Sequence, residues 1–488
     1  MRSHVSRGRP ALGLRAVLVV FALLAAACGN RLSTEEIVAQ NGGAATTASD
    51  QFASGATGAV SGADGANGSD GAATPSGTPA TAPAGSGKTS DSGGAQGEVG
   101  APPSSGGGDG VAPAGDGGGG QPSTPGETGP IVIGLVGTLS GPAGALNAPM
   151  AQGVQAWADM TNQRGGLFGR QVQVVRVDDG GDPSRHVAAV RDLVENRKVV
   201  AFVGNVTQFA LDSARGYLES KQVPLIGAGC DVEGMETSDI FFSQCPPFAN
   251  LVENIFRAQA KYGEGRKLAV IYCNEAEPCR TGRRLAEERA PAAGIEVVYS
   301  AGTSLAQPDF TSECINARDR GADVLFMSTD PNSAIRIADN CARQGYRPAI
   351  VAGPNTSPLA NQNRGLESML LAVPTFPFVG KQTPAAAEFE DVFAAATGDV
   401  PGPYAAEGWV SAKLFELAAT KAAAAMQSVS SKTLMDALYT VEGETLGGLA
   451  VPLTFKRGGG VENASCYWAV RSADGRWGAL NGPDPICN

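Results

Sequence analysis

Histidine and clusters of basic residues are scarce in this 488-residue chain. It has two histidines, and its 37 Lys and Arg residues are outnumbered by 48 Asp and Glu, which gives a net charge of −11 at pH 7. Proteins that bind nucleic acid need basic side chains against the phosphate backbone. An acidic chain without a run of Lys and Arg is therefore not expected to bind nucleic acid.

Sequence motifs of catalytic, metal and nucleotide sites are also missing. No CxxC pair and no GxSxG stretch occur, and the glycines at 134, 137, 141 and 144 do not form GxGxxG. His186 is the one histidine beyond the N-terminal segment, and its place in the first turn of a predicted helix suggests a surface residue. We therefore expect no enzyme activity, no cofactor and no metal site.

The first 28 residues are typical of an export signal. Four arginines lie within the first 15 residues, an apolar run covers residues 16–24, and three alanines precede Cys28. This pattern predicts a secretory signal over residues 1–27. It resembles a bacterial lipoprotein signal, in which Cys28 would become the lipidated first residue, although Ala25 stands where leucine is usual. The alternative is an ordinary secretory signal with an unrelated cysteine.

Residues 28–130 are predicted to be a disordered tether. From residue 41 to 130 the composition is dominated by Gly, Ala, Ser, Thr, Pro and Asp, and Phe52 is the only aromatic residue there. Such a stretch cannot bury enough apolar surface to offset the entropy lost on folding. A flexible chain of about 90 residues spans about 50 Å on average, which would hold the folded part clear of a membrane.

The folded part begins with a predicted strand, loop and helix. Residues 131–136 are apolar on both alternating faces, as in a parallel strand covered by helices on both sides. Gly, Pro and small polar residues predict a loop over 137–148, and apolar residues then recur at helical spacing from Met150 to Trp157. Ligands of open α/β sheets bind at the carboxyl ends of the strands. We therefore expect residues 138–147 to form one wall of a binding site.

The alternation of strand and helix continues along the chain. Strands and helices are predicted in turn from residue 171 to 226, and the pattern restarts at residue 248 and runs to 373, before three helices and an antiparallel tail. This order is the signature of parallel, doubly wound sheets. Because the part after residue 130 is too long for one compact core, we expect two α/β lobes with a ligand cleft between them.

Seven short motifs occur in a specific order along the folded part. They run from IGLVGTLSGP at residues 133–142 through 162–170, 178–183, 223–226, 322–326 and 365–371 to YAAEGW at 404–409. Together they resemble the type I periplasmic solute-binding proteins, in particular the branched-chain amino acid (Leu/Ile/Val) binding group. The resemblance covers about residues 130–480 and implies two lobes joined by three crossovers. The first lobe would take about residues 130–249 and 374–449, and the second about 250–373 and 450–488.

The resemblance also implies which positions would contact a ligand. Amino-acid binders of this family use a hydroxyl residue, a carbonyl-plus-threonine pair, aromatic residues and an acid. The corresponding positions here are Gln208 beside Thr207, Gly229 with Asp231, Leu146, residues near Cys279 and Thr329, and Asn355. With polar residues at the predicted loop ends, the candidate ligand-binding set is Thr138, Leu146, Thr207, Gln208, Gly229, Asp231, Asn274, Glu275, Thr329, Asp330 and Asn355.

These positions differ from the amino-acid-binding pattern of the family. A zwitterionic amino acid needs donors for its carboxylate and an anion for its ammonium, and each is costly to leave unpaired. Asp231 would repel the carboxylate, so the residues favour another polar ligand, for example a hydroxylated or cationic one. The alternative for several of them is a structural role, since Asp330 before Pro331 is also a good helix N-cap.

Nine cysteines are present, and eight remain once Cys28 is set aside. An even number in an exported chain predicts disulfides, although eight cysteines allow 105 connectivities. Pairing of sequence neighbours would give Cys230–Cys245, Cys273–Cys279, Cys314–Cys341 and Cys466–Cys487, each within one predicted lobe. Cys230 and Cys279 fall near the predicted cleft, so two of the bridges would fix binding loops.

The sequence thus predicts an extracytoplasmic lipoprotein anchored to the cell membrane through Cys28. It would capture a small polar ligand, such as an amino acid-like compound, an amide or a polyol, and deliver it to an ABC permease. We expect a monomer. The alternative is a sensory or scaffold lipoprotein of the same fold that signals to a protein partner or has lost ligand binding.

Overall fold

The computed structural model describes residues 129–207, 210–230, 235–353, 366, 368–425 and 428–487. The predicted signal over residues 1–27, the predicted lipidation site Cys28 and nearly all of the predicted tether lie outside these residues. None of the helices in the described part of the chain is both long and apolar enough to cross a membrane.

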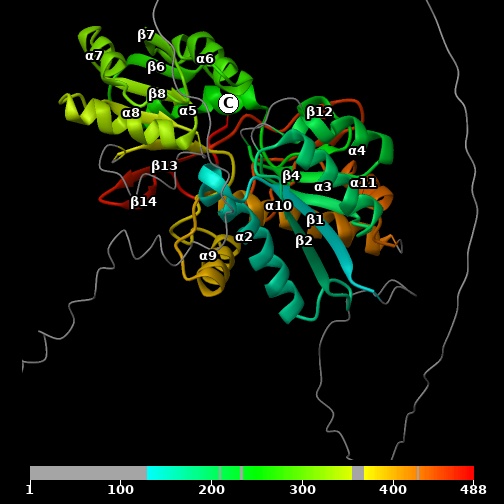
Figure 1. Ribbon diagram of the computed structural model, residues 1–488. Helices are drawn as coiled ribbons and strands as arrows, with labels where there is room; N and C mark the ends of the chain where they lie inside the picture. Colours follow the sequence, from blue (N-terminus) through cyan, green and yellow to red (C-terminus); the bar gives the residue numbers. More distant parts are fainter. Residues whose placement is uncertain are drawn as a thin grey trace, which may run out of the picture. The chain divides into compact units, whose positions relative to one another are not determined.

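The first sheet has five parallel strands in the order β2-β1-β3-β4-β5. Its strands are β1 (Ile131–Gly137), β2 (Val172–Asp178), β3 (Ala201–Asn205), β4 (Leu225–Ala228) and β5 (Phe241–Phe242). The elements that pack on this sheet or on one another are α2 (Gly141–Gln163), α3 (Pro183–Glu195), η1 (Leu211–Ala214), α4 (Arg215–Lys221), η2 (Met235–Thr237), α10 (Pro403–Ala424) and α11 (Ser431–Leu438). Figure 1 shows α3, α4, α10 and α11 gathered around these strands. Helices cover the central strands on both sides, which explains why their sequences are continuously apolar.

The second sheet has seven strands in the order β14-β13-β10-β9-β8-β6-β7. Five are parallel: β6 (Lys267–Cys273), β7 (Glu296–Thr303), β8 (Val324–Ser328), β9 (Ala349–Ala352) and β10 (Leu370–Val373). At one edge, β13 (Trp468–Ala473) pairs antiparallel with β10 and with β14 (Arg476–Ala479). Helix α5 (Phe248–Tyr262) precedes the parallel strands, and the helical elements between them are α6 (Glu277–Arg289), η3 (Pro291–Ala293), α7 (Thr311–Asp319) and α8 (Pro331–Arg343).

Alternating residues of the second sheet belong to two apolar cores. Leu268 and Val270 of β6 share a core with residues of α5 and α6. Ala269 and Ile271, which alternate with them, belong to the core that includes residues of α7 and α8. Because successive side chains of a strand point to opposite faces, both faces of this sheet are buried under helices. The two sheets with their helices (Figure 1) confirm the predicted pair of α/β lobes.

The chain after β10 first returns to the elements of the first sheet. Helix α9 (Pro384–Thr397) packs on α2, and the short hairpin of β11 (Phe455–Lys456) and β12 (Gly460–Val461) packs beside β5. Phe455 meets Phe242 edge to face, with ring centroids 5.4 Å apart. The sequence assigned residues 450–488 to the second lobe. The structure places this hairpin against the first sheet because Phe455 fills an apolar space beside Phe242.

Helix α2 begins earlier than the sequence suggested. Residues 137–148 were expected to form a loop, whereas the helix starts at Gly141 with Ser140 as its extended N-cap residue and a proline in its first turn. Proline suits a first turn because its missing N–H has no partner there in any helix. Gly144 is needed because a Cβ at this position would collide with the Leu139 carbonyl. The prediction was wrong because it counted Gly and Pro as helix breakers without regard to their position.

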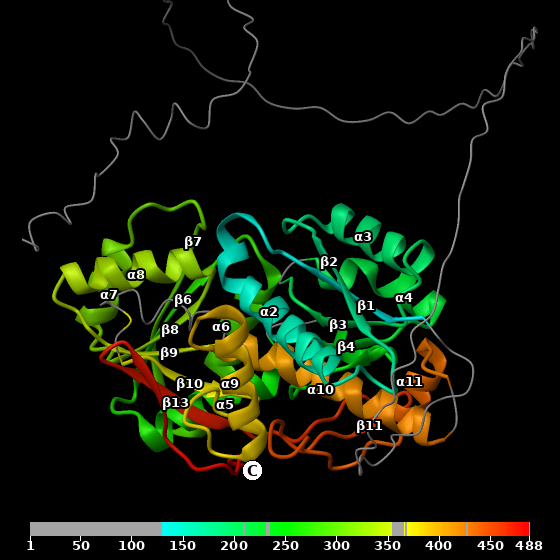
Figure 2. The ribbon, with the colours of Figure 1, turned by 90° about the horizontal axis from the view of Figure 1, so that it is seen from below.

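Helices α2 and α10 cross at very short range, and Figure 2 shows them running side by side. Gly153 of α2 faces the backbone of α10, where a Cβ would lie far inside contact distance of the Ala405 carbonyl oxygen. Gly408 of α10 faces the Met150 carbonyl of α2 in the same way. Near the same pair of helices, the Trp157 Nε1 donates to Glu416 at 2.9 Å. The two glycines therefore set how closely α2 and α10 can approach each other.

We expect Gly153→Ala to destabilise the protein, because the added methyl group would push α2 and α10 apart. Overpacking a close contact costs about 1–3 kcal/mol, whereas alanine gains at most about 1 kcal/mol in helix propensity. Urea unfolding should therefore give a lower free energy of unfolding for this variant than for the wild type.

Gly216→Ala is the matched control. Gly216 also lies in a helix, α4, and a methyl group there would meet no atom within 4 Å. This variant should be neutral or should raise the free energy of unfolding by up to about 1 kcal/mol. If both substitutions change the free energy of unfolding by the same amount, the close contact between α2 and α10 is not important for stability.

Candidate functional site

Polar side chains gather where the parallel strands of each sheet end. In the first lobe, Thr138 follows β1, Asp179 follows β2 and Thr207 lies two residues after β3. In the second lobe, Asn274 follows β6 and Thr329 follows β8. The carboxyl ends of parallel strands are the usual place for ligands in open α/β sheets. These two edges are therefore the candidate functional site, and each is described by itself.

Thr138 joins three loops of the first lobe by hydrogen bonds. Its hydroxyl donates to Asp179 Oδ1 at 2.8 Å and is hydrogen-bonded to the Thr207 hydroxyl at 3.1 Å. Its carbonyl oxygen accepts the side-chain amide of Asn147 at 3.0 Å. Thr138 is 7% exposed and Thr207 is 1% exposed. Both hydroxyls were expected to contact ligand, but in this structure they tie the loops after β1, β2 and β3 together.

His186 is buried, and the expectation of a surface histidine was wrong. It is 0% exposed, and its Nδ1 lies 2.9 Å from Asp179 Oδ2. Helix α3 begins at Pro183, after the N-cap Asp182, and its inner face carries His186, Val190 and Leu193. The carboxylate of Asp179, seven residues earlier and also buried, gives the imidazole a partner inside the lobe. An acid placed directly after a strand and shortly before the histidine is the signal that could have indicated this pair.

Asp179 is a buried carboxylate with several donors. Besides Thr138 and His186, the Gly181 amide donates to its Oδ1 at 2.8 Å. Burial alone would raise the pKa of Asp179, but the hydrogen bonds from His186, Gly181 and Thr138 outweigh it and hold the pKa below its ordinary value. Asp179 is therefore charged at neutral pH.

The loop after β4 is held from the side of α10. The Gly229 amide donates to the Asn205 carbonyl at 3.0 Å, and the Cys230 amide donates to Glu407 Oε2 at 3.2 Å. Glu407 is 0% exposed, in the middle of an apolar stretch of α10. Glu407 is not among the predicted ligand contacts, although a single acid among small apolar residues of a helix is a usable signal. Leu146, expected at a ligand-contacting position, is 5% exposed and belongs to the apolar core.

Three of the predicted ligand contacts lie outside the described residues. They are Gln208, Asp231 and Asn355. Their assigned roles stay predictions.

In the second lobe, Glu275 holds the loop after β7. It accepts the Ser304 hydroxyl at 2.6 Å and the Leu305 amide at 3.0 Å. The hydrogen bond from Ser304 holds the pKa of Glu275 below its ordinary value. Asn274 and Glu275 are exposed, and the Asn274 amide donates to the Thr303 carbonyl at 2.9 Å. The disulfide Cys273–Cys279 closes the short loop that carries both residues.

Asp330 caps helix α8. Its Oδ1 accepts the amides of Asn332 at 2.9 Å and Ser333 at 3.2 Å, which is the structural role considered for it from the sequence. Its Oδ2 is buried, and so is the hydroxyl of Thr329, and no described residue offers either of them a hydrogen bond. These two atoms are the unsatisfied acceptor and hydroxyl nearest the end of β8.

Arg336 adds a cation to this edge that sequence reasoning missed. Its Nη2 donates to the Leu305 carbonyl and to the Ser333 hydroxyl, both at 2.8 Å. The guanidinium also lies 5.8 Å from the centre of the Phe310 ring. Arg336 and Glu275 therefore both bind the loop after β7. Arg336 donates to the Leu305 carbonyl, and Glu275 accepts the Ser304 hydroxyl and the Leu305 amide. The spacing of three residues from Ser333 along the helix is the signal that could have indicated the contact.

The described residues of the two edges carry hydroxyl, amide and carboxylate groups, which are buried in the first lobe and partly exposed in the second. His186 and Asp179 are both 0% exposed, so the pair cannot reach a substrate directly. Among the same residues, no group of three or more His, Cys, Asp or Glu side chains is placed to hold a metal ion. Hydroxyl, amide and carboxylate groups on preformed loops suit reversible binding of a small molecule.

The eight cysteines of the folded part form four disulfides. The bonds are Cys230–Cys245, Cys273–Cys279, Cys314–Cys341 and Cys466–Cys487. These are the neighbour pairs suggested by the sequence. Two of them, Cys230–Cys245 and Cys273–Cys279, lie at loops that follow β4 and β6.

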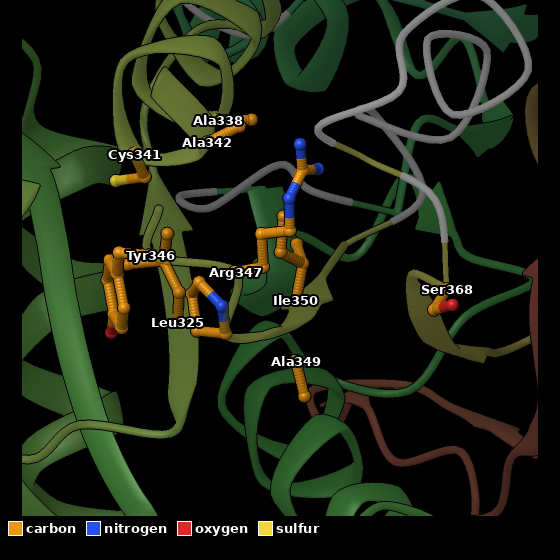
Figure 3. Close-up of a pocket in the computed structure, with 10 residues that line it drawn as sticks. Leu325, Ala338, Cys341, Ala342, Tyr346, Arg347, Ala349, Ile350 and Ser368 are labelled. Atoms are coloured by element: carbon orange, nitrogen blue, oxygen red, sulfur yellow. The ribbon is translucent and has the colours of Figure 1, made fainter. Parts of the chain in front are cut away.

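A separate cavity of about 260 Å³ lies in the second lobe, between the end of α8 and the start of β9 (Figure 3). Leu325 and Ile350 line it, and each is the second residue of its strand, so the cavity is near the amino ends of β8 and β9. Tyr346 also lines it, and burial raises the pKa of this tyrosine. None of the predicted ligand contacts lines this cavity, which is distinct from the candidate site.

Asp179 should make the stability of the first lobe depend on pH. Its folded-state pKa lies below the unfolded value of 3.8, so its contribution is present above that value and is lost as the pH falls through the folded pKa. Asp179→Asn should lower the free energy of unfolding by about 1–3 kcal/mol at neutral pH. The difference in the free energy of unfolding between the wild type and the variant should become smaller as the pH is lowered from about 6 to about 3. Thermal unfolding at each pH measures this difference.

Asp474→Asn, on the exposed turn between β13 and β14, is the control for this experiment. The free energy of unfolding of this variant should equal that of the wild type at every pH. If the free energies of unfolding of the wild type and Asp179→Asn differ by the same amount at every pH, the assignment of a charged, hydrogen-bonded Asp179 is contradicted.

Known proteins resemble parts of the chain in sequence. Residues 130–476 match the periplasmic binding protein family. Leu/Ile/Val-binding protein homolog 8 of Brucella abortus (strain 2308) is 25% identical over 236 residues, which cover 46% of this chain and 57% of that protein. Homolog 7 of the same strain is 22% identical over 233 residues, covering 46% and 58%. The chain therefore matches little more than half the length of these curated relatives.

Solved structures share the fold over nearly their whole length. The fatty acid ABC transporter substrate-binding protein from Thermomonospora curvata has a TM-score of 0.62 at 20% identity, covering 75% of this chain and 95% of that chain. An ABC transporter solute binding protein from R. palustris, in complex with benzoate, has a TM-score of 0.61 at 16% identity, covering 74% and 98%. A branched-chain amino acid transporter substrate binding protein from Streptococcus pneumoniae, in complex with isoleucine, has a TM-score of 0.59 at 18% identity, covering 74% and 100%.

Because these sequence identities are low, the solved structures are evidence for the fold alone. The match over residues 130–476 covers well over half of the chain and spans both sheets. This chain therefore belongs to the periplasmic binding protein family.

Proposed function

We propose that this protein captures a small polar solute between its two lobes and delivers it to an ABC permease. The observation that carries this proposal is the pair of polar edges at the carboxyl ends of the two sheets. At each edge, hydrogen bonds among the loops themselves hold the polar groups in place, as with Thr138 on Asp179 and Ser304 on Glu275. A site built in advance loses less entropy when it binds its ligand.

The ligand we propose is a polar compound other than a free branched-chain amino acid, such as an amide or a polyol. The solved structures do not share one ligand, since one protein is named for fatty acids and two others are in complex with benzoate and with isoleucine. In this chain Leu146 is a core residue, and the hydroxyls of Thr138 and Thr207 bond to each other. The unsatisfied Thr329 hydroxyl and Asp330 Oδ2 instead favour a ligand that donates hydrogen bonds.

The proposal includes a place in the cell. The predicted signal and Cys28 support export and attachment to the outer face of the membrane by a lipid. The acidic, Gly-rich tether over residues 28–130 would then let the two lobes reach a permease in the same membrane. We propose a monomer as the working unit.

A second candidate is a sensory or scaffold lipoprotein of the same fold. It is favoured by one observation: Thr138, Thr207 and Leu146 are nearly fully buried and serve the interior of the first lobe. A chain that no longer binds a solute could keep the fold and present its surface to a protein partner instead.

A thermal-shift screen of amino acids, amides, polyols, sugars and nucleosides tests the proposal. A ligand at about 100 times its Kd should stabilise the folded protein by about 2.7 kcal/mol. Amides or polyols should raise the melting temperature, and isoleucine should not. A shift with isoleucine alone would contradict the proposed ligand class.

Two variants separate binding in the candidate site from other effects. Gln208→Ala removes a predicted ligand contact and should abolish the ligand-induced shift. Gln155→Ala removes a glutamine of α2 whose amide donates to Asp159 at 2.8 Å, and it should keep the full shift. If no compound of any class shifts the melting temperature of the wild type, the second candidate function is favoured.

A further inference from the structure

Two chain segments run between the lobes beside the loop that follows β4. The first segment, residues 243–247, connects β5 of the first sheet to α5 of the second lobe. The last segment, residues 462–467, connects β12 to β13 of the second sheet. They are called here the first and the last crossover segments. Any change in the angle between the lobes must change the backbone in these segments.

Asn463 of the last crossover segment binds the first one. Its Nδ2 donates to the Ser243 carbonyl at 2.7 Å and to the Cys245 carbonyl at 2.8 Å. Its Oδ1 accepts the Thr454 amide at 3.1 Å. Asn463 is 3% exposed, so these bonds are shielded from water. Three of the four hydrogen-bonding positions of this amide are used, and its two donors hold the crossover segments together.

The first crossover segment is also fastened to the end of β4. Gln244 is 0% exposed and pairs with Ala228 in both directions. Its Oε1 accepts the Ala228 amide at 3.2 Å, and its Nε2 donates to the Ala228 carbonyl at 2.6 Å. One residue on, the disulfide Cys230–Cys245 joins the loop after β4 to the same segment. A covalent bond and a paired amide thus act at neighbouring positions.

The last crossover segment contacts the second lobe at Cys466, three residues after Asn463. The Asn254 side-chain amide of α5 donates to the Cys466 carbonyl at 3.3 Å, and Cys466 is bonded to Cys487. The contacts of Asn463 therefore lie at the point where the chain leaves the first lobe. Beyond this point the two crossover segments remain connected through α5.

We propose that Cys230, Gln244, Cys245 and Asn463 form one clamp that couples the loop after β4 to both crossover segments. Asn463 and the disulfide are its positioning residues. A displacement of Gly229 or Cys230 cannot be absorbed locally, because the disulfide carries it to Cys245 and the Asn463 amide carries it to the last crossover segment. If the proposed solute-binding function holds, a ligand that contacts and displaces this loop would also displace the crossover segments that join the lobes.

Hydrogen–deuterium exchange on the full chain, with no ligand present, tests the clamp. Asn463→Asp keeps the size of the side chain and its acceptor for Thr454, but turns a carboxylate toward two carbonyl oxygens. The clamp predicts that amides of residues 227–230 and 248–252 exchange at least tenfold faster in this variant. Because no ligand is used, the result does not depend on the proposed function.

Asn340→Asp is a closely matched control. Asn340 is 2% exposed, its Nδ2 donates to the Arg336 carbonyl at 2.6 Å and its Oδ1 accepts the Phe310 amide at 3.0 Å, all within the second lobe. It should lower the melting temperature by a similar amount while leaving exchange at residues 227–230 at the wild-type rate. If Asn463→Asp does not fold, Asn463→Ser removes the same donors without adding charge.

A double-variant comparison tests whether the disulfide carries the effect. In a chain with Cys230→Ala and Cys245→Ala, adding Asn463→Asp should speed exchange at residues 227–230 clearly less than it does with the disulfide present, because only the Gln244 amide then links Ala228 to the first crossover segment. Two results would overturn the proposal. One is faster exchange confined to residues 452–463 in Asn463→Asp, and the other is an unchanged effect of Asn463→Asp at residues 227–230 without the disulfide.

Discussion

The carboxylate of Asp179 is buried beside the ends of β1, β2 and β3 and accepts hydrogen bonds from Thr138, Gly181 and His186. A buried charge is tolerated only when such donors surround it, so none of the three partners can move away without a large cost. Thr138 extends the network to Thr207. The loops after β1, β2 and β3 are therefore one connected unit, and their polar groups keep fixed positions.

The second lobe reaches a similar result by other means. Glu275 and Arg336 hold the loop after β7 from two sides, and a disulfide closes the loop after β6. These groups are more exposed than Asp179, so each contact contributes less to stability. The two lobes are then linked by the clamp at Asn463. A protein that binds by moving two lobes needs each lobe to be stiff, so that motion is confined to the segments between them.

Much of the architecture could be predicted from the sequence because it depends on local pattern. The apolar run at 131–136 is β1, and Asp182 before Pro183 begins α3 as an N-cap residue. The helix at 141–163 was misjudged at its start because Gly and Pro were treated as breakers, while Pro is accepted in a first turn. At the candidate site, the sequence indicated which polar residues follow the strands but not what they contact. Asp330 caps a helix, and Thr138 links loops inside the first lobe.

The sequence by itself determined the order of strands and helices and the two α/β lobes, because each depends on residues close together in the chain. It left the disulfide connectivity open, and the structure showed that sequence neighbours pair. Only the tertiary structure decided that His186 is buried, since a helix can turn either face inward until its neighbours are present. It also brought the Glu407 carboxylate to the Cys230 amide, 177 residues away, and Asn463 to Cys245, 218 residues away. Contacts across such separations leave no periodic signal, because they arise from how the lobes pack and not from local backbone preference.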